Sequence, residues 1–146
     1  MQLEYDHVLK WHLNLLILPA ASQFVPYPMK VLIADDNAIM RSFIRSLVAD
    51  ISNDIHEAAN GSEAVRLAQE YLPDMILMDI RMPGLDGIAA TRVIMQAHAE
   101  TTVVIVTEFD SGEYRKAAIK AGAAAYVLKD DLNDLPETIA RILFLN

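Results

Sequence analysis

The sequence predicts an α/β domain in which a parallel β-sheet has helices on both faces, and two observations support this prediction. Strand-like and helix-like segments alternate five times between residues 30 and 146. The strand-like segments are nearly continuous runs of apolar residues, which is typical of parallel strands buried on both faces. With 146 residues, 53% of them apolar, the chain is long enough to form one domain with a full core.

The first two strand–helix units are predicted in the first half of this region. Residues 31–34 form a short apolar run that ends in two aspartates, as expected of a buried strand. Residues 37–50 have apolar side chains at helical spacing, and Asn37 is a candidate N-cap. A second, more polar strand is predicted at residues 54–58, followed by a helix over 61–71 that a proline ends.

The third and fourth units follow the same pattern. Residues 75–78 are an apolar strand that again ends in an aspartate, and a loop rich in proline and glycine leads to a helix over 88–97. Residues 103–106 form the fourth predicted strand, which ends at Thr107. The helix after it, over 111–121, is expected to end at Gly122, a typical C-terminal capping residue.

The fifth unit completes the domain. A strand is predicted at residues 125–128, and a helix at 133–144 with a proline in its first turn, where proline is tolerated. The regular pattern therefore divides the chain into an N-terminal extension, residues 1–29, and a domain over residues 30–146.

The extension has three interpretations at this point. It is an artefact of an upstream start site, with Met29 the natural first residue. It is a genuine segment that packs Trp11 and the apolar residues 13–18 on the domain or on a second copy. Or it is a short anchor at a membrane interface, which Glu4 and Asp6 disfavour because they sit badly near anionic lipid.

Composition excludes several functional classes. A net charge of −8 argues against direct nucleic-acid binding by this chain and suits a bound cation or a partner with a basic surface. The chain has no cysteine, which excludes disulfides and thiolate metal sites and fits a cytoplasmic location. No run approaches the ~20 apolar residues of a membrane span.

Polar residues follow four of the five predicted strands. Because ligands of open α/β sheets bind at the carboxyl ends of the strands, these residues are expected to meet at one edge. They are Asp35 and Asp36 after the first strand, Asp79 after the third, Thr107 at the end of the fourth, and Lys129 after the fifth.

Three carboxylates at one edge repel one another unless a cation lies between them, and Mg²⁺ prefers such oxygen ligands. A lysine can neutralise a phosphoryl oxygen, and a hydroxyl can donate a hydrogen bond to another. A carboxylate can itself act as the nucleophile and form an acyl phosphate. Each of these residues alone has an ordinary structural explanation, so the joint arrangement carries the prediction.

Four segments of the sequence closely resemble, in order and spacing, the receiver-domain motifs of two-component response regulators. They are residues 31–37, 77–87, 106–107 and 126–130, and the resemblance covers residues 30–146. It implies a doubly wound, flavodoxin-like fold with strand order 2-1-3-4-5. It also implies a signalling module that catalyses only its own phosphorylation and dephosphorylation, and is not an enzyme with an external substrate.

The resemblance also implies a role for each site residue. Asp79 would accept a phosphoryl group from a sensor histidine kinase or a phosphotransfer protein. Mg²⁺ would be bound by Asp36, Asp79 and the backbone carbonyl of Arg81, and mostly through water by Asp35. Thr107 and Lys129 would hold the phosphoryl oxygens. Thr107 and Tyr126 would move together as the conformational switch.

The implied output face comprises the fourth helix, fifth strand and fifth helix, at residues 111–144, through which two copies can pair. The family often has proline after the lysine. Here Asp130 follows, as in the subclass that usually precedes a helix-turn-helix DNA-binding domain. The residue after Thr107 is usually small, but here it is Glu108, whose charge would repel an incoming donor or water. We therefore predict slow autodephosphorylation.

Two other functions compete with this prediction. A Mg²⁺-dependent phosphohydrolase or phosphotransferase would also use Asp79 as nucleophile, but it normally needs a second carboxylate two residues later, where Arg81 stands. A phosphorylation-independent interaction module is the other alternative, and the complete set of Asp, Thr and Lys residues argues against it.

Overall fold

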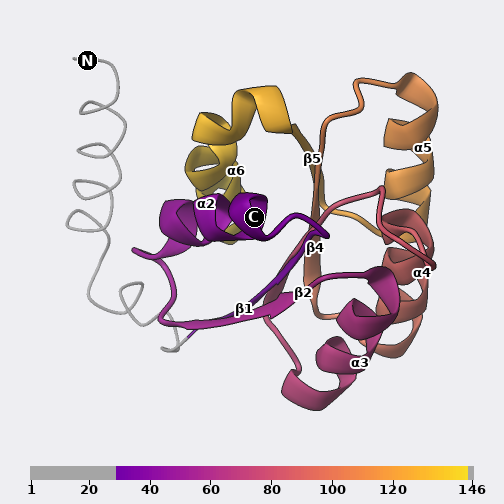
Figure 1. Ribbon diagram of the computed structural model, residues 1–146, viewed down its shortest axis with the longest axis horizontal. Helices are drawn as coiled ribbons and strands as arrows, with labels where there is room; N and C mark the ends of the chain where they lie inside the picture. Colours follow the sequence, from indigo (N-terminus) through magenta and orange to yellow (C-terminus); the bar gives the residue numbers. More distant parts are fainter. Residues whose placement is uncertain (1–28, 145–146) are drawn as a thin grey trace.

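Five parallel strands form one sheet in the computed structural model, which describes residues 29–144. The order in the sheet is β2-β1-β3-β4-β5, which confirms the predicted order. The strands are β1 (Lys30–Ala34), β2 (Asp54–Ala58), β3 (Met75–Met78), β4 (Thr102–Thr107) and β5 (Ala125–Leu128). Figure 1 shows the sheet between two layers of helices.

Four α-helices connect the strands, and a fifth follows the last strand. They are α2 (Ala38–Val48), α3 (Gly61–Tyr71), α4 (Gly87–Ala97), α5 (Gly112–Ala121) and α6 (Leu135–Phe144). Each of the first four has an N-cap residue whose side chain accepts a hydrogen bond from a backbone N–H of the first turn. Asn37 is the N-cap of α2, as predicted. Gly122, with φ of 109°, ends α5 in the left-handed conformation that favours glycine.

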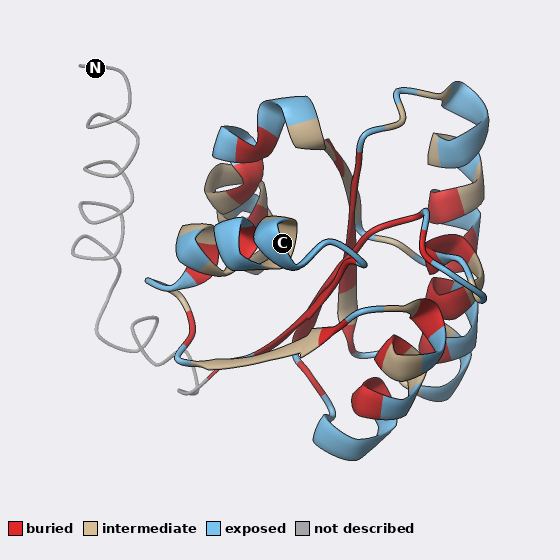
Figure 2. Ribbon diagram, viewed as in Figure 1, coloured by how far each residue is buried: buried red, intermediate tan, exposed pale blue. Residues whose placement is uncertain are grey.

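The two faces of the sheet carry separate apolar cores. Helices α2 and α6 cover one face, and α3, α4 and α5 cover the other (Figure 1). Neighbouring strand residues therefore pack into different cores: Met75 and Leu77 contribute to the first, and Ile76 and Met78 to the second. The strands are correspondingly buried along much of their length, as Figure 2 shows.

The register of the central strands sets the position of the loops that follow them. Ala34, the last residue of β1, is paired with Ala58 and Met78, which are the last residues of its two neighbours. Thr107 and Leu128 are likewise paired at the ends of β4 and β5. The residues after these strands therefore emerge side by side at one edge of the sheet.

The structure differs from the prediction at the start of the last helix. A 3₁₀-helix, η1 (Lys129–Asp134), follows β5 directly, and α6 begins at Leu135 instead of residue 133. Asp131 has non-helical dihedral angles, so the chain bends there, and the buried Leu132 holds the turn against the core. Pro136 occupies the first turn of α6, where its missing N–H costs no hydrogen bond.

Among residues 29–144, no helix is long and apolar enough to cross a membrane. The predictions for residues 1–28, including the contacts of Trp11 and residues 13–18, fall outside the described residues.

Candidate functional site

Main-chain hydrogen bonds fix the two acidic residues at the carboxyl edge of the sheet. The Asp35 N–H donates to the Ala58 carbonyl at 3.1 Å, and the Asp79 N–H donates to the Ala34 carbonyl at 2.8 Å. Both bonds continue the parallel ladder by one residue beyond the strands. The positions of Asp35 and Asp79 are therefore set by backbone pairing and do not depend on a loop conformation.

The structure brings the three predicted acidic residues together. One carboxylate oxygen from each of Asp35, Asp36 and Asp79 lies within 4.8 Å of the others. The side chains differ in environment, because Asp35 is 1% exposed and Asp79 is 5% exposed, whereas Asp36 is exposed to solvent. The cluster thus has two buried carboxylates and one at the surface, through which a cation or phosphodonor has access.

Lys129, which directly follows the edge strand β5, joins this cluster at the same edge of the sheet. Its Nζ lies 2.8 Å from Asp35 Oδ2 and 3.3 Å from Asp79 Oδ2, and its side chain is 15% exposed. Each carboxylate also accepts a backbone N–H through Oδ1, from Asn37 to Asp35 and from Ile80 to Asp79. The second oxygens of both carboxylates are therefore directed toward one ammonium group.

The cluster perturbs the proton affinity of its members. Burial raises the pKa of Asp79 to about 6; the charge of Lys129 opposes this shift and that of Asp35 adds to it. Burial acts to lower the pKa of Lys129, but the contacts and charges of Asp35 and Asp79 outweigh it and raise the pKa. Lys129 is therefore charged at neutral pH, and Asp79 is mostly ionised.

The donor set fits a divalent cation. When ionised, three carboxylates and one ammonium group leave two uncompensated negative charges. Asp35 Oδ2 is buried, and the Lys129 ammonium at 2.8 Å is the positive charge that faces it among the described residues. The all-oxygen set matches the preference of Mg²⁺.

Thr107 and Tyr126 are linked through Phe109. Thr107 is fully buried, and its Oγ1 accepts a hydrogen bond from the Phe109 N–H at 3.2 Å. The half-buried Tyr126 donates its hydroxyl to the Phe109 carbonyl at 2.6 Å. Burial raises the pKa of this hydroxyl, although Arg115 opposes the shift, so Tyr126 is a neutral donor. The loop after β4 is therefore held by both predicted switch residues.

Cationic side chains pack on the aromatic rings around this loop. The Arg81 guanidinium lies 4.4 Å from the centre of the Phe109 ring, and that of Arg115 lies 4.5 Å from the centre of the Tyr126 ring. Arg81 and Glu108 are both exposed at the mouth of the site. The guanidinium contact concerns the side chain of Arg81, so the predicted metal contact of its backbone carbonyl stays a prediction.

The sequence analysis missed an ion-pair network behind Asp35. Glu57 binds both Arg41, at 2.9 Å, and Arg45, at 2.8 Å, and Arg41 donates to the Asp35 carbonyl at 2.7 Å. These arginines hold the pKa of Glu57 below its ordinary value despite partial burial. Glu57 is the penultimate residue of β2, so its place at the same edge was the signal that could have revealed it.

Close packing of α4 also positions Asp79. The Gly87 N–H donates to the Ile80 carbonyl at 2.7 Å, and an ideal Cβ on Gly87 would lie 1.7 Å from the Asp79 carbonyl oxygen. Only glycine allows the backbone of α4 to approach the residue after β3 this closely.

Comparison with known proteins agrees with this fold. Residues 31–140 match the family model of the response regulator receiver domain. The chain is 40% identical to the uncharacterised transcriptional regulatory protein YhcZ of Bacillus subtilis over 104 residues, which is 70% of this chain and 49% of that protein. It is also 40% identical over 100 residues to the chemotaxis protein CheY of Halobacterium salinarum, covering 68% of this chain and 83% of that one.

A solved structure of a response regulator has the same fold. The DNA-binding response regulator of the LuxR family from Staphylococcus aureus superimposes with a TM-score of 0.72 at 31% sequence identity, covering 79% of this chain and 98% of that chain. This chain spans about half the length of YhcZ, and its relatives include transcriptional regulators, which agrees with the predicted subclass. The chain belongs to the response regulator receiver domains, the phosphorylation-switched signalling modules of two-component systems.

Proposed function

We propose that Asp79 accepts a phosphoryl group in a Mg²⁺-dependent reaction and that the resulting aspartyl phosphate changes the output face. The observation that carries this proposal is the convergence of Asp35, Asp36, Asp79 and Lys129 at one sheet edge. The donor would be the phosphohistidine of a sensor histidine kinase or of a phosphotransfer protein. The proposal includes a cytoplasmic location and the division into an extension, residues 1–29, and a receiver domain, residues 30–146.

The transfer step forms one bond and breaks one. A carboxylate oxygen of Asp79 attacks phosphorus, the bond from phosphorus to the donor imidazole nitrogen breaks, and the imidazole leaves with the electron pair and takes up a proton. Bound Mg²⁺ would supply the positive charge that draws the phosphoryl oxygens and the attacking carboxylate together. Asp36, Asp79 and the Arg81 carbonyl would hold it directly, and Asp35 mostly through water.

Lys129 and Thr107 would bind the product. Lys129 contacts both Asp35 and Asp79, so a cation at the carboxylates would release its ammonium group to a phosphoryl oxygen. Thr107 Oγ1 accepts a hydrogen bond from the Phe109 N–H, which leaves the hydroxyl proton of Thr107 available to a phosphoryl oxygen. This reorientation would disturb the Phe109 main chain, to which the Tyr126 hydroxyl is bonded.

The switch would therefore run from Thr107 through the Phe109 loop to Tyr126 and the surface of α5, β5 and α6. Thr107 and Tyr126 contact the main chain of Phe109 at 3.2 Å and 2.6 Å, and the Arg115 guanidinium of α5 lies 4.5 Å from the centre of the Tyr126 ring. A shift of Tyr126 would thus change the packing of Arg115 and the surface around it. We propose that this surface takes the output partner or a second copy of the chain.

A small phosphodonor tests the proposal directly. The chain is incubated with acetyl phosphate and Mg²⁺, and its intact mass is measured. We expect one added phosphoryl group that is lost in Asp79→Ala and kept in the control Asp131→Ala, which removes an exposed carboxylate of η1. An excess of chelator should abolish the adduct. An adduct that persists in Asp79→Ala would refute the assignment of the acceptor.

Multiple turnover separates this function from a hydrolase. A receiver accepts one phosphoryl group per chain and does not cleave a generic phosphate ester repeatedly, whereas a hydrolase would.

Sedimentation of the phosphorylated and unphosphorylated chain tests the output face. Phosphorylation should alter self-association, and substitutions on α5 should remove that difference.

A further inference from the structure

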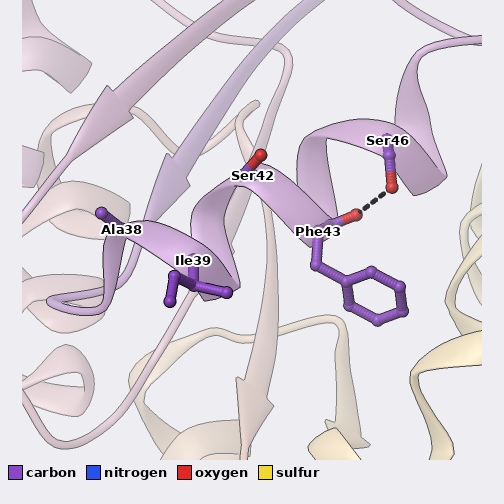
Figure 3. Close-up of a pocket in the computed structure, with 5 residues that line it drawn as sticks. All are labelled: Ala38, Ile39, Ser42, Phe43 and Ser46. Carbon is purple, nitrogen blue, oxygen red and sulfur yellow. Dashed lines mark hydrogen bonds between the residues drawn. The ribbon is translucent and has the colours of Figure 1, made fainter.

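Helix α2 carries an apolar face that no described residue covers. Ile39 is 82% exposed and Phe43 is 44% exposed, although both are large apolar side chains. They lie four residues apart, and Figure 3 shows them projecting from the same side of the helix. Together with Ala38, Ser42 and Ser46 they line an open pocket, which we call the α2 face.

The α2 face is uncharged. None of its five lining residues carries a charge, and the two arginines of the helix, Arg41 and Arg45, are paired with Glu57 of β2. Uncharged apolar surface of this kind usually marks a contact site. The charge of −8 on the chain disfavours a second copy of the same acidic protein as the occupant.

The N-terminal segment has matching chemistry. Residues 13–18 read Leu-Asn-Leu-Leu-Ile-Leu and contain no charged residue, and Trp11 lies two positions before them. Six residues of which five are apolar gain free energy by leaving water, at roughly 25 cal/mol per Å² of apolar surface buried. The α2 face and this run are thus two apolar surfaces of one chain, each of which is stabilised by being covered.

The described structure also begins beside this helix. Met29 is buried in the core that α2 and α6 share, and its carbonyl accepts a hydrogen bond from Ser52 Oγ, four residues after the end of α2. The chain therefore enters at the C-terminal end of α2, on the side of the sheet that α2 covers. From Val48 back to Ile39 the helix rises about 14 Å, at 1.5 Å per residue. The ten residues between Leu18 and Met29 reach up to roughly 35 Å when extended, which is more than enough.

We propose that the α2 face is the docking site of residues 1–28 of the same chain, with Trp11 and residues 13–18 as the contacting groups. A tether of this length gives the segment an effective concentration on the order of millimolar, so modest apolar contact suffices for docking. Helix α2 begins two residues after Asp36, so the docked segment lies near the carboxylate cluster.

Trp11 is the only tryptophan of the chain, so its fluorescence reports on this segment alone. The full-length chain should show a blue-shifted emission maximum and weak quenching by acrylamide. Ile39→Asp should shift the emission to the red and increase quenching. The matched control is Ile119→Asp on α5, since Ile119 is 67% exposed but lies in the opposite helix layer. That control should leave both signals unchanged.

Several outcomes would overturn the proposal. They are a solvent-exposed Trp11 in the parent chain, an Ile39→Asp variant with unchanged quenching, and an equal response to Ile119→Asp. Shielding of Trp11 that grows with protein concentration, together with a doubled sedimenting mass, would assign the face to a second copy instead. Ile39 is too exposed for its substitution to damage the core, and a far-ultraviolet circular dichroism spectrum checks that Ile39→Asp is folded. None of these measurements depends on phosphorylation.

Discussion

Replacing Gly87 with alanine should displace the main chain that carries Asp79. An alanine Cβ would lie 1.7 Å from the Asp79 carbonyl oxygen and 2.7 Å from its carbonyl carbon, whereas real Cβ contacts stay beyond 3.0 Å. The two backbones must therefore separate by about 1.3 Å. Neither neighbour is the flexible end of a side chain, so α4 or the residue after β3 has to move.

Two effects of this displacement have separate magnitudes. Overpacking of this kind costs about 1–3 kcal/mol, and the strained hydrogen bond from Gly87 to Ile80 adds to it. For a chain of this size each kcal/mol lowers the melting temperature by about 4 °C, so a fall of roughly 4–12 °C is expected. A displacement of about 1 Å at a reacting group also slows chemistry by roughly 100-fold.

Gly112 provides the matched control. It is also the first residue of a helix, but nothing lies within 4 Å of an added Cβ and its φ is not positive. Gly112→Ala should therefore be neutral or stabilise the protein by about 0.4–1 kcal/mol. Thermal unfolding followed by circular dichroism gives the stability, and intact mass after timed exposure to acetyl phosphate gives the rate. Equal stabilities and rates for Gly87→Ala and Gly112→Ala would refute the packing argument.

Three further predictions concern charge. The pKa of Glu57 is lower in the folded than in the unfolded state, so Glu57 stabilises the native state above the unfolded pKa, and this contribution is lost as pH falls through the folded pKa. Glu57→Gln should therefore lower the free energy of unfolding by about 1 kcal/mol at pH ~7 and leave it unchanged in acid. Urea unfolding at both pH values measures this, and a difference that stays constant with pH would contradict it. Lys129→Met should tighten Mg²⁺ binding, measured by calorimetry, because it removes a cation that competes for Asp35 and Asp79. The same substitution should slow phosphorylation by about 10²–10³-fold. Weaker Mg²⁺ binding would contradict this prediction. Glu108→Ala should shorten the lifetime of the aspartyl phosphate, and a parent chain that loses it within seconds would contradict the predicted slow dephosphorylation.

The convergence of the site residues could be predicted because it follows from topology alone. Once the strands are parallel, residues that come after them share an edge, and Asp35, Asp79 and Lys129 meet there whatever their rotamers. The order of the strands came from the family resemblance. Helix ends were predicted best where a cap residue marks them, as Asn37 and Gly122 do.

Contacts that depend on side-chain conformation could not be predicted from the sequence. The Arg81–Phe109 stacking and the bond from Tyr126 to the Phe109 carbonyl require rotamers and a loop path that no periodicity encodes. The η1 turn was missed because Lys129–Asp134 is almost wholly polar and resembles a loop, whereas the single buried Leu132 gives it its structure. Glu57 was overlooked because β2 has no polar residue after its last position.

The position of Lys129 after the last strand has a consequence for biosynthesis. A nascent chain that has emerged from the ribosome only as far as β4 holds all three carboxylates but lacks the ammonium group that pairs with Asp35 and Asp79. Without it, two buried anions face each other uncompensated, which opposes closure of that edge. We therefore expect a chain that ends after β4 to be less stable at this edge than the complete domain.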